Sequence, residues 1–226
     1  MSTETEKMKE RYAKRKADQR VVAHGQASSF IRYSSEEREA IFLNFIKKYL
    51  GEPSSIRVLE IGAGGGGNIS FFKKIGVPAS QIVANELLDD RVELLRERHP
   101  DITIIPGDAT VMKAEEIGKF DVVFQSTVFT SILDTNFQSV LANSMMGLLN
   151  ESGMLLWYDF VYNNPNNPDV RKVTIDQVKQ LFPELDFKFK KVTLAPPIGR
   201  RVGPFYPVFN ALPFLRTHII GAGLRH

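Results

Sequence analysis

The sequence predicts a doubly wound α/β fold with a seven-stranded, mostly parallel sheet and an N-terminal helical lid. Short apolar segments alternate with amphipathic ones through most of the chain, which is typical of a parallel sheet covered on both faces. A glycine-rich turn directly after the first apolar segment is the second indication. The third is size, because 226 residues, 43% of them hydrophobic, can build the core of one domain.

The N-terminal segment predicts a lid or arm rather than part of the sheet. Residues 4–18 form a charged pattern of helical period with few apolar side chains, typical of a segment that is mobile or orders only when something binds. A looser stretch, residues 21–33, contains His24. We therefore expect an arm over residues 1–33 and the main domain over residues 34–226.

A capping-box pattern marks the expected start of the first helix of the main domain. Ser34 and Glu37 occupy the two key positions of that motif, and Gly51 with Pro53 ends the helix. The apolar segments that follow predict strands at 56–61, 82–86, 102–105, 120–125, 153–160, 187–194 and 215–225. Helices are expected to start near Asn68, Asp89, Ala114, Thr135 and Thr174.

Composition excludes several classes of function. The chain has no cysteine, which excludes disulfides, thiolate metal sites and cysteine nucleophiles. The net charge of +3 is too small to indicate nucleic-acid binding, although no acidic residue follows Asp186. The four histidines show no metal-ligand spacing. No secretory signal or membrane-spanning run is visible, so a cytoplasmic protein without a metal is expected.

The turn Gly62-Ala63-Gly64-Gly65-Gly66-Gly67 follows the first strand and opens a helix. Glycine tolerates positive φ and lets a backbone approach its ligand closely. The spacing also matches the dinucleotide fingerprint, so the turn predicts a nucleotide-like ligand without naming it.

Three acidic residues around this turn narrow the choice of ligand. Glu60 lies two residues before Gly62, where a carboxylate can organise the turn or meet a cation such as the ammonium group of S-adenosylmethionine (SAM). Glu86 ends the second strand, where a carboxylate can accept both ribose hydroxyls. Asp108 follows the third strand, where it can accept from the adenine amino group. The charge of Glu60 disfavours a pyrophosphate and favours SAM.

These residues resemble the ordered motifs of class I SAM-dependent methyltransferases. The resemblance covers roughly residues 55–194 and rests on Val58-Leu59-Glu60-Ile61-Gly62-Ala63-Gly64, Glu86, Gly107-Asp108 and Phe120-Asp121-Val122-Val123-Phe124. It implies a Rossmann-like methyltransferase fold, a last strand antiparallel to the others, and SAM as cofactor. The residues expected to hold the cofactor are Glu60, Gly62, Ala63, Gly64, Glu86, Leu87, Asp108, Ala109 and Gln125.

The segments after the fourth and fifth strands are expected to lie over the cofactor, because open α/β sheets bind ligands beyond the carboxyl ends of their strands. A hydroxyl acceptor needs a base to remove its proton. Asp159, at the exit of the fifth strand, can act as that base, orient one, or cap the following loop. His24 is the other candidate because histidine titrates near neutral pH, its alternative being a plain surface position.

The acceptor-side segments resemble those of a bacterial methyltransferase subgroup associated with polysaccharide and other glycan pathways. They are Ser126-Thr127-Val128-Phe129, Leu156-Trp157-Tyr158-Asp159-Phe160 and Tyr162-Asn163-Asn164-Pro165. The resemblance implies O-methylation of a sugar or glycan, although the asparagines can equally be turn formers. The residues expected to bind the acceptor are Ser126, Thr127, Tyr158, Asn163, Asn164, Arg171, Arg200 and Arg201.

An insertion between the sixth and seventh strands combines Arg200 and Arg201 with the aromatic residues Phe205, Tyr206, Phe209 and Phe214. Basic groups beside exposed aromatic ones can bind a phosphate-bearing or lipid-linked glycan, or touch a membrane surface. The alternative is a helix that packs its aromatic face onto the sheet.

Three other functions remain open from the sequence. A methyltransferase for a small aromatic or amine metabolite calls for an apolar acceptor pocket. A SAM-binding module without catalysis calls for an acceptor cavity blocked by side chains. An NAD-dependent reductase predicts preference for NADH over S-adenosylhomocysteine. The sequence carries no signal for the acceptor atom or the oligomeric state.

Overall fold

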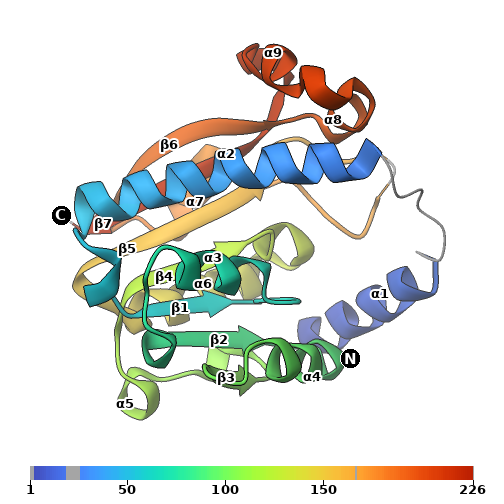
Figure 1. Cartoon of the computed structure of the whole chain (residues 1–226). Coiled ribbons are helices and arrows are strands. Elements are labelled where there is room, and N and C mark those ends of the chain that lie inside the picture. The colour runs from blue at the N-terminus through green and yellow to red at the C-terminus, as the bar shows by residue number, and fades with distance from the viewer. Residues whose placement is uncertain (1–2, 19–25, 166, 226) are drawn as a thin grey trace.

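The structure, a computed structural model that describes residues 3–18, 26–165 and 167–225, is organised around a seven-stranded sheet (Figure 1). The strand order is β3-β2-β1-β4-β5-β7-β6. Strands β1 to β5 pair in parallel, whereas β7 is antiparallel to both β5 and β6. The predicted fold class, with its antiparallel last strand and its N-terminal helices, is confirmed.

The strands lie close to their predicted positions, except that the fifth begins earlier. They are β1 (Val58–Ile61), β2 (Ile82–Glu86), β3 (Thr103–Pro106), β4 (Phe120–Ser126), β5 (Leu149–Phe160), β6 (Leu185–Leu194) and β7 (Arg216–Arg225). The sequence predicts this strand only from residue 153, but Leu149 pairs with Phe120 across a register shift in the ladder. Pairing with β4 therefore extends β5 beyond its apolar part.

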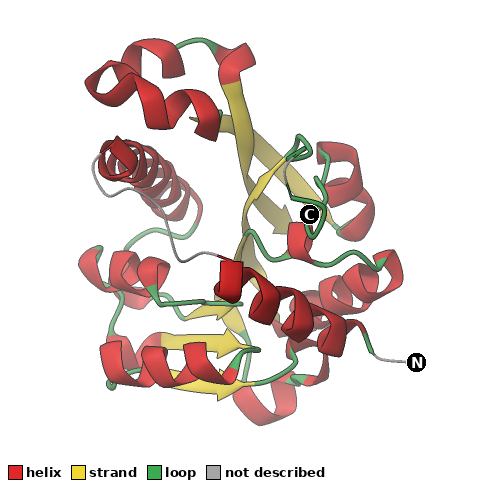
Figure 2. Ribbon diagram, turned by 90° about the vertical axis from the view of Figure 1, so that its right-hand side faces the viewer, coloured by secondary structure: helices red, strands yellow, loops and turns green. Residues whose placement is uncertain are grey.

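The helices of the described residues are α1 (Glu4–Asp18), α2 (Gln26–Tyr49), α3 (Gly67–Lys74), α4 (Asp89–Arg98), α5 (Ala114–Ile117), α6 (Thr135–Leu148), α7 (Ile175–Leu181), α8 (Pro196–Val202) and α9 (Tyr206–Asn210). Helices α2 to α7 form two layers that cover the two faces of the sheet (Figure 2). Side chains from α2, α3 and α4 join the core on one face, and those from α5, α6 and α7 join it on the other.

The predicted start of the second helix at Ser34 is wrong. Helix α2 begins at Gln26 and runs across the boundary expected between the arm and the main domain. The Ser34 hydroxyl donates to the carbonyl of Ile31 at 3.1 Å instead of capping a terminus. Phe30 packs against Gly199, where an added Cβ would lie 2.4 Å from its ring. This tertiary contact favours continuation of the helix over the local capping signal.

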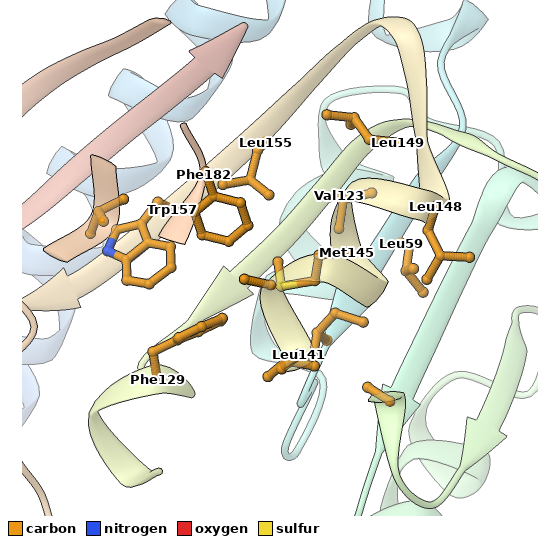
Figure 3. Close-up of a cluster of buried hydrophobic side chains, with 14 of the residues drawn as sticks. Leu59, Val123, Phe129, Leu141, Met145, Leu148, Leu149, Leu155, Trp157 and Phe182 are labelled. Carbon is orange, nitrogen blue, oxygen red and sulfur yellow. The ribbon is translucent and has the colours of Figure 1, made fainter. Parts of the chain in front are cut away.

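Two apolar layers hold the sheet. Figure 3 shows the layer between the sheet and α6, where Leu141, Met145 and Leu148 face strand residues that include Trp157. Burying each such side chain contributes about 1.5–3 kcal/mol. Met8 of α1 also belongs to this layer. The N-terminal helix is therefore anchored to the same core that positions the carboxyl ends of the strands.

Candidate active site

A cavity of about 210 Å³ lies at the carboxyl ends of β1, β2, β3 and β4, where the predicted cofactor residues converge. Helix α1 contributes Thr5, Met8 and Tyr12 to its wall, and Figure 1 shows α1 beyond the arrowheads of β1 and β2. The wall also contains most of the residues expected to hold the cofactor, namely Gly62, Ala63, Gly64, Glu86, Leu87, Asp108 and Ala109.

The glycine turn needs glycine at particular positions. Gly62 has φ +66°, and a Cβ there would lie 2.6 Å from Cγ2 of Val128. Gly66 has φ +81°, and a Cβ there would lie 2.5 Å from the ring of His99. Gly67 has neither a positive φ nor any heavy atom within 4 Å of an added Cβ. The close approach that the sequence indicates is therefore required at Gly62 and Gly66, whereas Gly67 only begins α3.

Glu86 joins the glycine turn to the start of α4. One carboxylate oxygen accepts from the backbone N–H of Gly64 at 2.7 Å, and the other accepts from that of Leu88 at 2.9 Å. The side chain is buried and lines the cavity. Each carboxylate oxygen has two lone pairs, so acceptor capacity remains for a pair of ligand hydroxyls.

Asp108 connects the cavity to the N-terminal helix. Its Oδ1 accepts from the backbone N–H of Thr110 at 2.8 Å. Its Oδ2 accepts from the hydroxyl of Thr5 at 2.9 Å. The carboxylate that the sequence assigns to adenine recognition therefore also holds α1 in place.

Glu60 is a fully buried carboxylate behind the cavity wall. Its Oε1 accepts from the side-chain amide of Asn68 at 2.6 Å, and Asn68 lines the cavity. Its Oε2 is buried without a hydrogen-bond partner in the part of the chain that the structure describes. Burial raises the pKa of Glu60 to about 8. A buried carboxylate with a spare oxygen fits a site built for a cationic group.

Helix α1 is held over the cavity by polar contacts. The buried carboxylate of Glu4 accepts from Nη2 of Arg11 at 2.7 Å and from the N–H of Leu133 at 3.0 Å. Arg11 also donates to the carbonyl of Ser131 at 3.0 Å, and the Tyr12 hydroxyl lies 3.0 Å from the Ser131 hydroxyl. These contacts explain how a helix with few apolar residues docks on the domain.

A second cavity, of about 680 Å³, adjoins the first. Tyr12, Thr127 and Ser131 line both cavities. Thr127 has φ +59°, a conformation that costs a β-branched residue free energy and that recurs at functional sites. Its N–H donates to the carbonyl of Tyr158 at 2.8 Å, which holds the turn in that conformation. The junction of the two cavities is the place where a donor in one can meet an acceptor in the other.

The predicted acceptor residues divide between the cavities and the rest of the molecule. Asn163, Asn164 and Arg200 line the second cavity, and Ser126 lines the first.

Three others line neither cavity. The Tyr158 hydroxyl contacts that of Thr193 at 3.0 Å within the core, because side chains alternate along β5. Arg171 donates to the carbonyl of Leu133 at 2.5 Å, which fixes it in the loop, and Arg201 is exposed.

Asp159 is fully buried and lines neither cavity. It accepts from the Thr130 hydroxyl at 2.7 Å, and Thr130 lines the second cavity. Burial raises the pKa of Asp159 to about 7. The geometry matches a residue that orients a neighbour, one of the roles expected for it. His24, the other candidate base, lies outside the described residues.

Gln125 also lies behind the cavity walls. It is fully buried, its Oε1 accepts from the N–H of Val128 at 3.0 Å, and its amide donates to the carbonyl of Tyr158 at 3.4 Å. Gln125 therefore acts on the cavities through the turn that carries Thr127.

His218 lines the second cavity, although no sequence pattern singles it out. Its ring stacks on that of Tyr158 at 5.1 Å, and its Nδ1 lies 3.0 Å from the Thr217 hydroxyl. Burial, with a smaller contribution from Arg38, lowers the pKa of His218 to about 4, so the imidazole is neutral at physiological pH. The antiparallel register pairs His218 with Phe160 and so brings it beside the predicted acceptor loop.

Within the ranges that the structure describes, no group of three or more histidine, cysteine, aspartate or glutamate side chains could hold a metal ion. Across the same ranges, no helix combines the length and the apolar character needed to cross a bilayer.

Residues 59–157 match the family model of a methyltransferase domain. Over 141 residues the chain is 28% identical to a malonyl-[acyl-carrier protein] O-methyltransferase of Bacillus cereus. That alignment covers 61% of this chain and 50% of the relative, so the chain spans about half the length of the curated protein it matches.

The fold is similar to those of solved SAM-dependent methyltransferases. One from Archaeoglobus fulgidus has a TM-score of 0.57 at 14% identity, with 87% of this chain and 99% of that chain covered. The glycopeptide N-methyltransferase MtfA in complex with S-adenosylhomocysteine has a TM-score of 0.57 at 18% identity, with 85% and 90% covered. A TehB-like methyltransferase from Corynebacterium glutamicum has a TM-score of 0.57 at 11% identity, with 89% and 100% covered. Residues 59–157 therefore match a methyltransferase domain, and the chain has the fold of solved SAM-dependent methyltransferases.

Proposed function

We propose that the protein is an O-methyltransferase acting on a sugar or glycan acceptor, phosphate-bearing or lipid-linked. The observation that carries the proposal is the large second cavity, which meets the cofactor cavity at Tyr12, Thr127 and Ser131. Amide, hydroxyl and guanidinium groups from Asn163, Asn164, Thr217 and Arg200 line it. Such groups suit an acceptor rich in hydroxyls, and the guanidinium suits a phosphate.

On the cofactor side, each acidic residue has a chemical partner in SAM. Glu86 offers two carboxylate oxygens to the ribose hydroxyls, and Asp108 offers an acceptor to the adenine amino group. Glu60 supplies negative charge for the ammonium group, and the glycine turn lets the backbone come close. SAM supplies the methyl group as a sulfonium, so the contribution of the protein is alignment and exclusion of water.

In the proposed reaction, a bond forms between the acceptor oxygen and the methyl carbon while the carbon–sulfur bond breaks. The electron pair of that bond stays on sulfur, and the hydroxyl proton passes to a base. His218 is neutral and lines the acceptor cavity, so it can take this proton. Asp159 positions Thr130 in the cavity wall, and His24 remains a candidate from the sequence.

The name of the relative and the composition of the chain agree with this proposal. The Bacillus cereus relative is named as an O-methyltransferase, which agrees with an oxygen acceptor. The absence of cysteine agrees with a reducing compartment, and we propose a cytoplasmic location.

An acceptor screen with methyl-labelled SAM tests the proposed substrate class. We expect label in sugars, glycans or lipid-linked saccharides, with the variant Glu86→Gln as the inactive control and Glu97→Gln, at an exposed position of α4, as the matched active one. Label only in hydroxyaromatic or amine acceptors would replace the glycan proposal with a small-molecule one. SAM binding without label in any acceptor would indicate a non-catalytic module.

The pH profile of kcat/KM tests the role of His218. Loss of a general base typically lowers kcat by about 10²–10⁴-fold, so His218→Asn should show a loss of that size with unchanged SAM affinity. The acidic limb of the wild-type profile should disappear in the variant. An unchanged limb would exclude His218 as the base and leave His24 to be tested by the same substitution.

A further inference from the structure

The segment between β6 and β7 carries an unusual concentration of exposed apolar side chains. Exposed large hydrophobic residues are scattered singly over the rest of the described chain, but five fall within residues 205–214. They are Phe205 (65% exposed), Val208 (66%), Phe209 (39%), Leu212 (42%) and Phe214 (74%), and together they are called the apolar patch. Figures 1 and 2 show this segment, around α8 and α9, projecting from one edge of the sheet.

The segment is held firmly by other residues, so the exposure is a property of its fold. Tyr206 is buried, stacks on Tyr33 at 5.5 Å, and accepts from the N–H of Leu194 at 3.2 Å. Asn210 is also buried, and its amide donates to Glu37 of α2 at 2.8 Å. The sequence offered the alternative that the aromatic residues of this insertion pack inward. Tyr206 does so, whereas the residues of the apolar patch do not.

The charged residues of the insertion that carries the apolar patch are all positive. Arg200 and Arg201, in the last turn of α8, are exposed. The chain has no acidic residue after Asp186, so the whole insertion lacks negative charge of its own. Exposed aromatic side chains and exposed arginines on one insertion match the interface of an anionic lipid bilayer, where aromatic rings insert and arginines contact the headgroups.

We propose that the apolar patch docks this protein on the surface of an anionic membrane. A second copy of the chain fits less well, because a symmetric contact through the patch would bring the arginines of two copies together without acidic partners from the insertion. A lipid surface offers both the apolar depth and the negative charge.

The apolar patch and part of the wall of the second cavity belong to the same insertion. Pro196, Pro197 and Arg200 of α8 line the second cavity, and the same insertion carries the patch. Docking would thus bring the acceptor cavity near the lipid headgroups, where a lipid-linked saccharide presents its sugar. This consequence rests on the proposed function, whereas the docking itself does not.

Co-sedimentation with lipid vesicles tests the docking. We expect the wild-type chain to sediment with vesicles of phosphatidylcholine mixed with phosphatidylglycerol, and much less with phosphatidylcholine alone. The triple variant Phe205→Ser/Phe209→Ser/Phe214→Ser should bind at least about tenfold more weakly, because it loses most of the apolar contact. The matched control is Val111→Ser/Val140→Ser, which removes exposed apolar groups (68% and 51%) elsewhere on the surface and should bind like wild type.

A tryptophan reporter distinguishes insertion from electrostatic adhesion. Trp157 is fully buried, so the variant Phe214→Trp adds one exposed indole to a constant background. The emission of this indole should shift to shorter wavelength when anionic vesicles are added. In the variant Phe205→Ser/Phe209→Ser/Phe214→Trp, which keeps the indole and lacks the other two phenylalanines, the emission should stay unchanged.

Three results would overturn the proposal: no vesicle binding by the wild type, equal binding by the triple variant, or a dimer in light scattering that the triple variant abolishes. The last would show that a second copy covers the patch. Calorimetric SAM binding checks that each variant is folded. Because vesicle binding needs no turnover, failure of the docking and failure of the glycan assignment give different results.

Discussion

Glu60 is a carboxylate buried behind the cofactor cavity, with one oxygen that finds no partner among the described residues. Burial raises its pKa to about 8, so the cofactor-free protein holds it protonated near neutral pH. An ammonium group nearby favours the ionised form and lowers that pKa. Cofactor binding and proton release are therefore coupled at this residue.

We predict that SAM binding near pH 7 releases a proton from Glu60. Calorimetric titrations in two buffers with different ionisation enthalpies measure the number released. The release should disappear in Glu60→Gln, which keeps the shape of the side chain and removes its titration, and should persist in Glu97→Gln. Equal proton release by wild type and Glu60→Gln would place the ammonium group elsewhere.

Glycine positions in the turn provide a second test at the residue scale. Gly62→Ala must place a Cβ 2.6 Å from Val128 at a φ of +66°, so we expect a loss of about 1–3 kcal/mol in the free energy of unfolding and weaker SAM binding. Gly67→Ala meets no atom within 4 Å and should leave both unchanged. Denaturant unfolding and calorimetry measure the two effects. Equal losses in the two variants would contradict a specific need for glycine at position 62.

At the scale of elements, α1 decides how open the cofactor cavity is. The helix contributes three residues to the cavity wall, yet it is tied down mainly by Glu4, Arg11 and their partners in the loop after β4. The apparent affinity then depends on the fraction of molecules in which α1 is docked.

We predict that Arg11→Met loosens α1 and weakens SAM binding. The variant leaves the buried carboxylate of Glu4 without its ion-pair partner, which costs about 1–3 kcal/mol. Amide hydrogen exchange in residues 4–18 should become faster, and the Kd for SAM should rise. Lys9→Met, at an exposed position of the same helix, is the control and should behave like wild type. Unchanged exchange in Arg11→Met would mean that other contacts hold the helix.

At the scale of the whole molecule, buried titratable groups make stability depend on pH. The pKa of Glu60 rises from 4.5 to about 8 and that of Asp159 from 3.8 to about 7, both mainly through burial. Each carboxyl binds more protons in the folded state, so stability falls as pH rises between the two values. His218, lowered from 6.5 to about 4, has the opposite effect, and that effect ends at pH 6.5.

We therefore predict that the free energy of unfolding of the cofactor-free protein falls between pH 6.5 and about 8, where the two buried carboxyls bind more protons in the folded than in the unfolded state. Urea unfolding at several pH values measures the slope. Glu60→Gln and Asp159→Asn should each reduce it, and Glu97→Gln should not. Stability that rises through this range would show that the two carboxyls are ionised in the folded protein.

The sequence by itself determined the fold class and the order of the strands along the chain, and it predicted a set of cofactor residues, most of which line the first cavity. Those features depend on local patterns: apolar periodicity, a glycine turn after a strand, and acidic residues at strand ends. The early start of α2 and the extension of β5 could not be predicted, because Phe30 and Leu149 find their partners far away in the sequence.

Only the tertiary structure decided the arrangement on the proposed acceptor side. The sequence places Tyr158 and Asp159 at a strand exit, but alternation along β5 sends them to opposite faces of the sheet, where they contact Thr193 and Thr130, and neither lines a cavity. His218 enters the second cavity because β7 runs antiparallel to β5 and returns the chain to that edge. Tyr12 enters it through the docking of α1, which Arg11 helps to hold in place. Long-range pairing and docking bring such residues together, and no local pattern encodes them.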